Sequence, residues 1–289
     1  MDNQSALRDF LVTRRNAITP QQAGLPLVGR RRVPGLRRDE VAGLAGVSVE
    51  YYTRLEQGKA AGVSEDVMRA LAKALQMNDV EMDHFQALVR NLGSRPVQGR
   101  TRKPVAAAPR AAVEILVDSI TEAAAVVRNE RLDIVAANKL GRALYAAMFR
   151  QPRGTVNHAR FIFLDPASHE FHTNWDAAAD DAVAMLRVAA GRDPFDRNLS
   201  DLIGELSTRS DDFRVRWAAH NVHKHSTGLK SFHHNAVGNL ELKYEQLSFD
   251  ADPGLSLLVY FADPGTPSHD ALLLLETWAA SKAAAPHGS

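Results

Sequence analysis

The feature that most constrains this 289-residue chain is a pair of short helical segments joined by a three-residue turn. Residues 37–45 (RRDEVAGLA) place apolar side chains at helical spacing, and the turn follows at 46–48. Ser48 is a favourable N-cap for a second helix over 49–57 (VEYYTRLEQ), and Gly58 is the residue type expected just after a helix end. Two helices joined by a short glycine-containing turn form a helix-turn-helix.

The same residues divide the motif into an inner and an outer side. Ala42 is small where the two helices would meet, and Tyr52 and Leu55 point inward at helical spacing. The outer face of the second helix would then carry Ser48, Val49, Glu50, Thr53 and Arg54. These are the positions that reach base edges when such a helix lies in a major groove. Any pair of packed helices has a similar outline, so the pattern alone is only moderately specific.

Three further segments predict helices around this pair. They are residues 7–14, 64–75 and 79–91, each with apolar residues three or four positions apart. Five short helices without β-branched runs predict an all-α domain over residues 1–93.

Charge is distributed unevenly along the chain. The net charge of the whole chain is +1. Residues 1–104 contain 17 Lys and Arg and 11 Asp and Glu, a net charge of +6. Residues 105–289 contain 18 Lys and Arg and 23 Asp and Glu, a net charge of −5. Such an asymmetry directs the search for a nucleic-acid contact to the basic part. Five arginines at its centre have no acid between them: Arg30, Arg31, Arg32, Arg37 and Arg38. A run of charged residues usually lies in a solvated loop. Because these arginines lie next to the helix-turn-helix, we expect them to contact DNA phosphates.

Composition excludes several other classes of protein. The chain has no cysteine, which excludes disulfides, iron–sulfur clusters, thiolate zinc sites and a cysteine nucleophile. Its longest apolar runs are far shorter than the ~20 residues of a membrane span, and its first residues do not resemble a signal peptide. We therefore expect a cytoplasmic protein with no membrane partner. Residues 94–112, rich in Gly, Pro, Ala and Arg, predict a linker, and residues 283–289 predict a flexible tail.

The remaining residues, 113–282, predict an α+β domain. Strands are expected over 124–128, 131–135, 228–233, 240–245 and 255–261, the last of them apolar nearly throughout, as in a central strand. Helices are expected over 138–149, 175–190, 199–207, 211–219 and 270–280. This order predicts an antiparallel sheet of about five strands with flanking helices.

Both halves of the chain resemble one known family. Residues 25–58, LPLVGRRRVPGLRRDEVAGLAGVSVEYYTRLEQG, resemble the XRE-type (lambda-repressor-like) helix-turn-helix regulators of the bacterial MmyB-like group. The second half resembles the MmyB-like ligand-binding domain, which is PAS-like, through RLDIVAANKLGRALY (131–145), NHARFIFLDP (157–166), GELSTRS (204–210), FHHNAVGNLEL (232–242) and DPGLSLLVY (252–260). Asn235 stands where the family commonly has Pro, which affects the local loop only.

The resemblance implies a transcription regulator that binds double-stranded DNA sequence-specifically as a homodimer. It implies a five-helix lambda-repressor-like domain followed by a PAS-like domain with an apolar pocket for a small, fatty-acid-like ligand. It assigns backbone contacts to Arg37 and Arg38, and base contacts to Val49, Glu50, Thr53 and Arg54. An alternative remains open, in which the second half is a ligand-free dimerisation or protein-interaction module.

Candidate residues for the ligand site are Asn157, Arg160, Phe161, Phe163, His233 and His234. The guanidinium of Arg160 would suit a ligand carboxylate, but an ion pair with Asp165 or another acid is an equally favoured interpretation.

Histidines are concentrated in one stretch of the second half, at positions 220, 223, 225, 233 and 234. Imidazoles bind metals, but no acid lies in this stretch and the spacing matches no standard motif, so we expect no metal. Nucleophile-elbow, Walker, H-E-x-x-H and dinucleotide-binding motifs are missing from the sequence. We therefore expect no catalytic residue, no enzymatic activity and no cofactor other than the apolar ligand.

Overall fold

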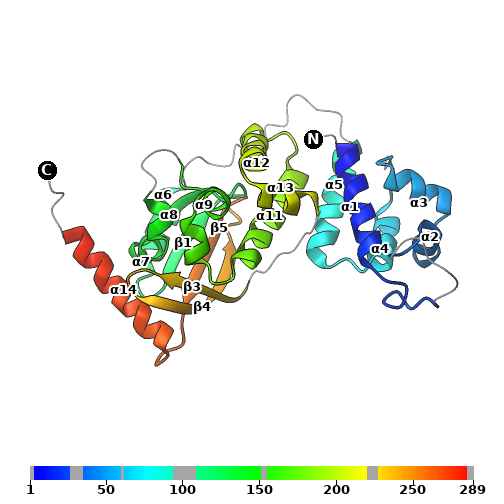
Figure 1. Cartoon of the computed structure of the whole chain (residues 1–289). Coiled ribbons are helices and arrows are strands. Elements are labelled where there is room, and N and C mark those ends of the chain that lie inside the picture. Colours follow the sequence, from blue (N-terminus) through cyan, green and yellow to red (C-terminus); the bar gives the residue numbers. More distant parts are fainter. Residues whose placement is uncertain are drawn as a thin grey trace. The chain divides into compact units, whose positions relative to one another are not determined.

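The computed structural model divides the chain into two compact units. One unit, called the helical unit below, comprises Met1–Arg100 with Arg187–Ser200 and Val215–His223. The other, called the C-terminal unit, contains the rest of the chain. The structure describes residues 3–26, 35–59, 62–93, 109–150, 155–219 and 227–284. Figure 1 labels the elements of both units. In these ranges, no helix has the length and apolarity that crossing a bilayer requires.

The N-terminal hundred residues form the predicted helices. These are α1 (Asn3–Ala17), α2 (Arg38–Ala45), α3 (Val49–Glu56), α4 (Glu65–Ala74) and α5 (Asp79–Gly93). Their apolar faces meet in one core, in which Phe10, Tyr52 and Phe85 are fully buried. This part of the fold-class prediction is confirmed.

The turn between α2 and α3 has the geometry that the sequence predicts. Gly46 has φ 66° and ψ 29°, in the left-handed region that favours glycine. The N–H of Val47 then donates to the carbonyl of Ala42 at 3.0 Å, which satisfies one of the last carbonyls of α2. Ser48 begins α3 as its N-cap, since its hydroxyl accepts the N–H of Tyr51 at 3.1 Å.

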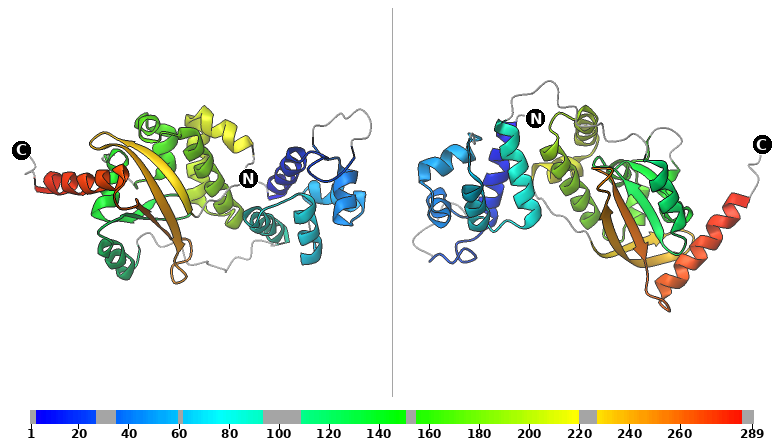
Figure 2. Two further views of the ribbon diagram at one scale, coloured as in Figure 1. Left: turned by 90° about the horizontal axis from the view of Figure 1, so that it is seen from below. Right: turned by 180° about the vertical axis from the view of Figure 1, so that it is seen from behind.

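A five-stranded antiparallel sheet organises the C-terminal unit, as Figure 2 shows from two further sides. Its strands are β1 (Ala124–Arg128), β2 (Ile134–Ala137), β3 (Thr227–His234), β4 (Gly238–Ser248) and β5 (Ser256–Phe261), in the spatial order β2-β1-β5-β4-β3. The apolar strand β5 is central, as predicted, and Tyr260 on it pairs with Ala124 on one side and Tyr244 on the other.

The two faces of this sheet are covered by different helices. On the outer face, α6 (Ala111–Ser119) packs Val113 and Val117 against β1 and β5. The inner face packs against apolar residues of α7, α8, α9, α10 and α14. The helices that follow β2 are α7 (Lys139–Leu144), α8 (Ala146–Phe149), α9 (His158–Leu164), α10 (Ala167–Phe171), α11 (Trp175–Arg192), α12 (Arg197–Arg209), α13 (Asp211–Ala218) and, after β5, α14 (Pro267–Ala284).

Asn138 joins three of these elements through one side chain. Its Oδ1 accepts the N–H groups of Ala125 in β1 at 3.0 Å and of Gly141 in α7 at 2.6 Å. Its Nδ2 donates to the carbonyls of Ile120 at 2.6 Å and Ala123 at 2.8 Å. The helix start is therefore fixed to β1, and α7 approaches so closely that a Cβ on Gly141 would lie 2.3 Å from the carbonyl oxygen of Ala125.

The structure corrects three details of the prediction. The strand expected over 131–135 begins at Ile134, because Oδ1 of Asn129 accepts the N–H groups of Arg131 and Asp133 and holds that stretch in a turn. The helix expected over 138–149 is interrupted at Tyr145, which has ψ 27°. Helices α6, α9 and α10 were not predicted, because they are too short to show a clear apolar period, and α9 is in addition buried on nearly all sides.

Candidate functional site

The first candidate site is the outer surface of α3. Ser48, Val49, Glu50 and Arg54 are exposed there, and Thr53 is half-buried. The structure therefore brings all five predicted base-reading residues to one helix, from its N-cap Ser48 to Arg54 in its last turn. The opposite side of α3 is held in the core by Tyr52 and Leu55.

The predicted phosphate contacts fall into two groups. Arg37 is exposed directly before α2, and its backbone N–H donates to the carboxylate of Glu40 at 2.6 Å. The side chain of Arg38 is 52% exposed, yet its guanidinium is already paired with an acid. The other three, Arg30, Arg31 and Arg32, lie outside the described residues.

The acid that pairs with Arg38 is Glu56, a buried residue at the end of α3. Its Oε1 accepts Nε and Nη2 of Arg38 at 2.9 and 2.7 Å, and its Oε2 accepts Nε of Arg15 in α1 at 2.9 Å. Burial alone would raise the pKa of Glu56, but the hydrogen bonds from the two arginines hold it below its ordinary value. This ionised carboxylate therefore connects α1, α2 and α3.

Sequence reasoning missed this network, although one signal was present. Glu56 follows Tyr52 by four positions on the inward face of the helix, where an acid is unusual unless it is paired. Two arginines were available to pair with it, but nothing in their spacing distinguished them from the other arginines of the basic half.

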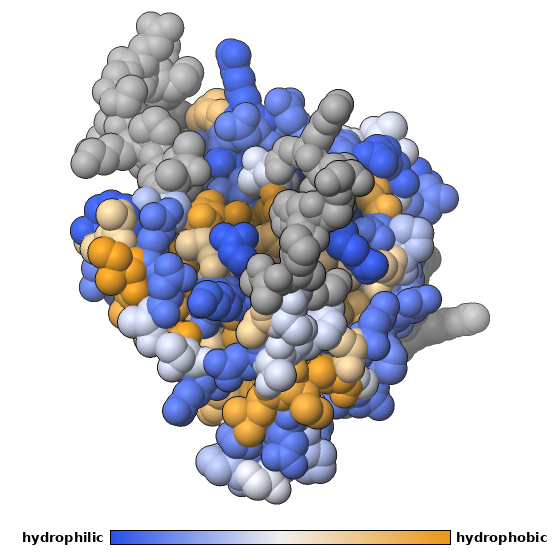
Figure 3. All heavy atoms as spheres, turned by 90° about the vertical axis from the view of Figure 1, so that its left-hand side faces the viewer, coloured by the Kyte–Doolittle hydropathy of each residue, from blue (hydrophilic) through white to orange (hydrophobic). Residues whose placement is uncertain are grey.

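The second candidate site is a groove of about 1140 Å³ in the C-terminal unit. It lies between α7, α8, α14 and the turn that joins β3 to β4, and its apolar lining includes Leu140, Phe149, Phe171, Trp278 and several alanines. Figure 3 shows the face of this unit that carries α14, where apolar side chains form patches between charged ones.

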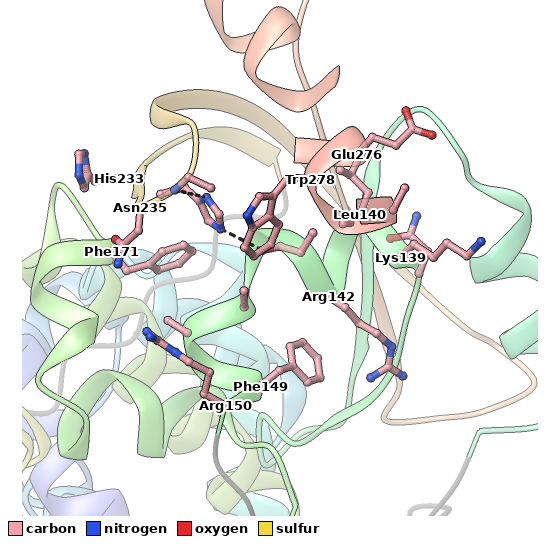
Figure 4. A pocket seen from close by; sticks show the side chains of 18 of the residues that line it. Lys139, Leu140, Arg142, Phe149, Arg150, Phe171, His233, Asn235, Glu276 and Trp278 are labelled. Carbon is pink, nitrogen blue, oxygen red and sulfur yellow. Dashed lines mark hydrogen bonds between the residues drawn. The ribbon is translucent and has the colours of Figure 1, made fainter. Parts of the chain in front are cut away.

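The close view of the groove separates apolar from charged side chains. Trp278, Phe149 and Phe171 point toward a common central space, whereas Lys139 and Arg142 extend away from it (Figure 4). The guanidinium carbon of Arg142 lies 5.2 Å from the ring centroid of Phe149, and its Nε donates to a backbone carbonyl at 3.2 Å. Lys139 and Arg142 are therefore at the margin of the groove, whose lining also includes Arg150, Glu170 and Glu276.

Two predicted ligand residues, His233 and His234, line this groove. His233 is exposed, and its Nδ1 lies 2.7 Å from Oδ1 of Asn239. His234 is buried: its Nε2 lies 3.1 Å from the carbonyl oxygen of Ala143, and its Nδ1 accepts the N–H of Ala236. A carbonyl only accepts, so Nε2 carries the proton, and the imidazole is neutral and fixed in position.

The other four predicted ligand residues do not line the groove. Asn157 is the N-cap of α9 and also binds Asp133, and Phe161 and Phe163 are buried. Arg160 pairs with Glu205 through Nε and Oε2 at 2.8 Å, which is the structural alternative that the sequence left open.

The expected absence of a metal concerns the histidine-rich stretch. Among the described residues, no three metal-binding side chains come together. Positions 220, 223 and 225 lie outside the described part of the chain.

Comparison with known families assigns both parts of the chain. Residues 13–85 match the model of a helix-turn-helix domain, and residues 109–275 match the model of the MmyB-like transcription regulator ligand binding domain. Comparison with curated proteins finds no match. The second match covers more than half of the chain and contains the whole sheet and most of the groove. The protein is therefore a helix-turn-helix transcription regulator and belongs to the family with the MmyB-like ligand binding domain.

Proposed function

We propose that this regulator binds a defined operator as a homodimer and that its groove binds a small, largely apolar, fatty-acid-like ligand. The observation that carries the ligand part is the apolar centre of the groove between Trp278, Phe149 and Phe171. No enzymatic activity is part of this proposal.

The DNA part rests on the chemistry of two surfaces. The exposed surface of α3 offers a carboxylate from Glu50, a guanidinium from Arg54 and an apolar group from Val49, which are groups that read base edges. Arg37 and Arg38 lie together at the start of α2, where a phosphate would meet their positive side chains.

The ligand part rests on size and polarity. Small-molecule sites usually have volumes of roughly 300–1,000 Å³ and mostly apolar walls, and this groove of about 1140 Å³ is slightly larger than that range. A ligand can change operator affinity only by as much as its own affinity differs between two conformations of the protein. The regulator would therefore respond to the ligand through a shift between two such conformations.

Selection from random duplexes tests the DNA part. The full chain should enrich one near-palindromic sequence, and Arg54→Ala should enrich a more degenerate one. The absence of any enriched sequence would favour the alternative in which the helical unit binds a protein.

A neutral apolar probe tests the ligand part. We expect 1-decanol to bind the full chain in a titration by calorimetry, and Ala147→Trp, which fills the groove, to abolish binding. Ala177→Trp, at an exposed alanine of α11 outside the groove, is the matched control and should bind normally. Equal binding by both variants would place the ligand elsewhere. No binding to the unsubstituted chain would favour a ligand-free dimerisation domain.

A further inference from the structure

Arg128 is a buried cation in the interior of the C-terminal unit. It ends β1 on the inner face of the sheet and is only 6% exposed. Its Nη2 donates to Oε1 of Gln246 at 2.9 Å, and no carboxylate of the described residues forms an ion pair with it. Burial lowers its pKa, because the charged form loses its solvation.

Two histidines lie in the same interior, and the first is tied to the turn that follows β1: the N–H of His158 donates to the carbonyl of Leu132, four residues after Arg128, at 2.9 Å. His158, at the beginning of α9, and His172, just after α10, are 6% and 5% exposed, and their ring centroids are 5.7 Å apart. The Nε2 atom of each is buried without a hydrogen-bond partner in the described part of the chain. Burial, followed by the positive charges of His172, Arg128 and Lys230, holds the pKa of His158 well below its ordinary value.

The neighbouring groups do not neutralise this charge. Asp181 is the acid whose charge reaches Arg128, but its Oδ2 is already paired with Nζ of Lys230 at 3.2 Å. The hydroxyls of Tyr145 and Tyr260 are hydrogen-bonded to each other at 2.8 Å. Arg128 is therefore left without an acid of its own among the described residues, and two buried imidazole Nε2 atoms have no hydrogen-bond partner there.

Buried charges are normally paired, and buried polar atoms normally have hydrogen-bond partners. An anion with two oxygen atoms would supply a counter-charge for Arg128 and hydrogen-bond acceptors for the imidazoles. A guanidinium binds a carboxylate through two parallel hydrogen bonds, and an Nε2 that carries a proton donates a further one. We propose that Arg128, His158 and His172 form a buried binding site for a carboxylate, either that of a small acid or the head group of a longer one.

This carboxylate site is distinct from the groove, but one residue belongs to both surroundings. Phe171 lines the groove, and its ring centroid lies 4.9 Å from that of His172. Rotation of this ring would open the carboxylate site toward the groove. A long acid would then leave its chain in the groove, whereas a small acid would occupy the carboxylate site alone. The inference does not depend on the groove being a ligand site.

Three probes of the full chain distinguish these cases: sodium propionate, sodium decanoate and 1-decanol, titrated by calorimetry at one pH and ionic strength. We expect decanoate, propionate or both to bind, and Arg128→Met to weaken carboxylate binding about 10-fold or more. Lys243→Gln removes an exposed cation of β4, paired with Asp263 and outside both the carboxylate site and the groove, and is the matched control, with carboxylate binding expected to be unchanged.

His172→Phe keeps the test decisive if Arg128→Met does not fold, since it removes one Nε2 and leaves the arginine in place. Loss of carboxylate binding in this variant supports the site, and far-UV circular dichroism checks that the variant is folded. Carboxylate binding that persists in both variants, or that is lost in Lys243→Gln instead, overturns the inference. Binding of 1-decanol alone also overturns the inference but leaves the proposal of a ligand in the groove standing. Binding of propionate without binding of 1-decanol supports the carboxylate site and contradicts the proposal of an apolar ligand in the groove.

Discussion

Arg38 of α2 places both its Nε and its Nη2 on a single oxygen, Oε1 of the buried Glu56 in α3. The other oxygen of this carboxylate receives Arg15 of α1, so one buried acid holds two cations. Glu56→Gln would leave Arg15 buried without a counter-charge, and we expect it to destabilise the helical unit by about 3–5 kcal/mol. Urea unfolding of the full chain, with hydrogen exchange measured in α1–α3, tests this expectation.

Glu50→Gln is the control, because it removes an acid from the exposed side of the same helix. The pKa of Glu56 is lowered in the folded protein, so its contribution is present above the ordinary carboxyl pKa and is lost as the pH falls through the folded value. Equal stability of the two variants at neutral pH would contradict a structural role for the Glu56 pairs.

The arginines at the start of α2 should behave differently when removed. Arg37→Ala should weaken binding to all duplexes without affecting folding. The slope of the logarithm of the binding constant against the logarithm of the salt concentration should become shallower by about 1, the value for one phosphate contact. Arg38→Ala should show the same loss together with reduced stability, because it also breaks the pair with Glu56. Gel shifts at several salt concentrations, combined with thermal melts, separate the two effects. Arg69→Ala, on an exposed face of α4, should change neither.

Arg54 carries the prediction for base recognition. Arg54→Ala should cost roughly 1–3 kcal/mol of operator affinity and relax sequence preference at one position, because a guanidinium reads guanine through two hydrogen bonds. Competition between the selected operator and single-base variants measures this. Unchanged affinity and selectivity would remove Arg54 from the base-reading residues.

Two glycines of the C-terminal unit make a contrasting pair. Gly141→Ala would drive a Cβ into the carbonyl of Ala125, and we expect a loss of roughly 3 kcal/mol or more. Gly204→Ala, in the interior of α12, meets nothing within 4 Å and should stabilise that unit by up to about 1 kcal/mol. Thermal denaturation of both variants tests the close approach of α7 to β1, and a neutral Gly141→Ala would contradict it.

The buried His172 predicts sensitivity to acid. Burial lowers its pKa from 6.5 to about 3, so the unfolded chain binds the proton first as the pH falls. Stability should therefore decrease below pH 6.5, by about 2 kcal/mol at pH 5 from this residue alone. His172→Phe should show a shallower loss between pH 6.5 and 5 in urea unfolding. His233→Gln, at an already exposed histidine, should follow the original profile, and identical profiles for all three proteins would refute the prediction.

Local signals in the sequence were sufficient for the helix-turn-helix. The glycine at position 46, the cap at Ser48 and the apolar spacing of 49–57 act over a few residues, and the structure has the expected conformation at each. The alternation along β4 and the apolar run of β5 similarly predicted the sheet and its central strand.

The rest depends on contacts between residues that are distant in the sequence. Arg160 was a candidate ligand residue because a guanidinium suits a carboxylate, but its Nε donates to Glu205, a residue 45 positions later in the sequence. The groove combines side chains from α7 with others from α14, and Arg128 became notable only because no acid of the described residues forms an ion pair with it. Tertiary packing decides which side chains are paired and which are not. These pairings produce no periodic pattern of apolar residues, so they cannot be predicted from the sequence in the way that helices and strands can.

The side chain of Asn138 has a consequence for how this fold diverges. All four of its hydrogen-bonding positions are occupied, two as acceptor and two as donor. Aspartate would lose both donors, leucine would lose all four bonds, and glutamine would displace the amide by one methylene. Each of these substitutions would therefore break or displace at least one of the four bonds, and we expect asparagine to persist at this position in relatives whose groove residues differ.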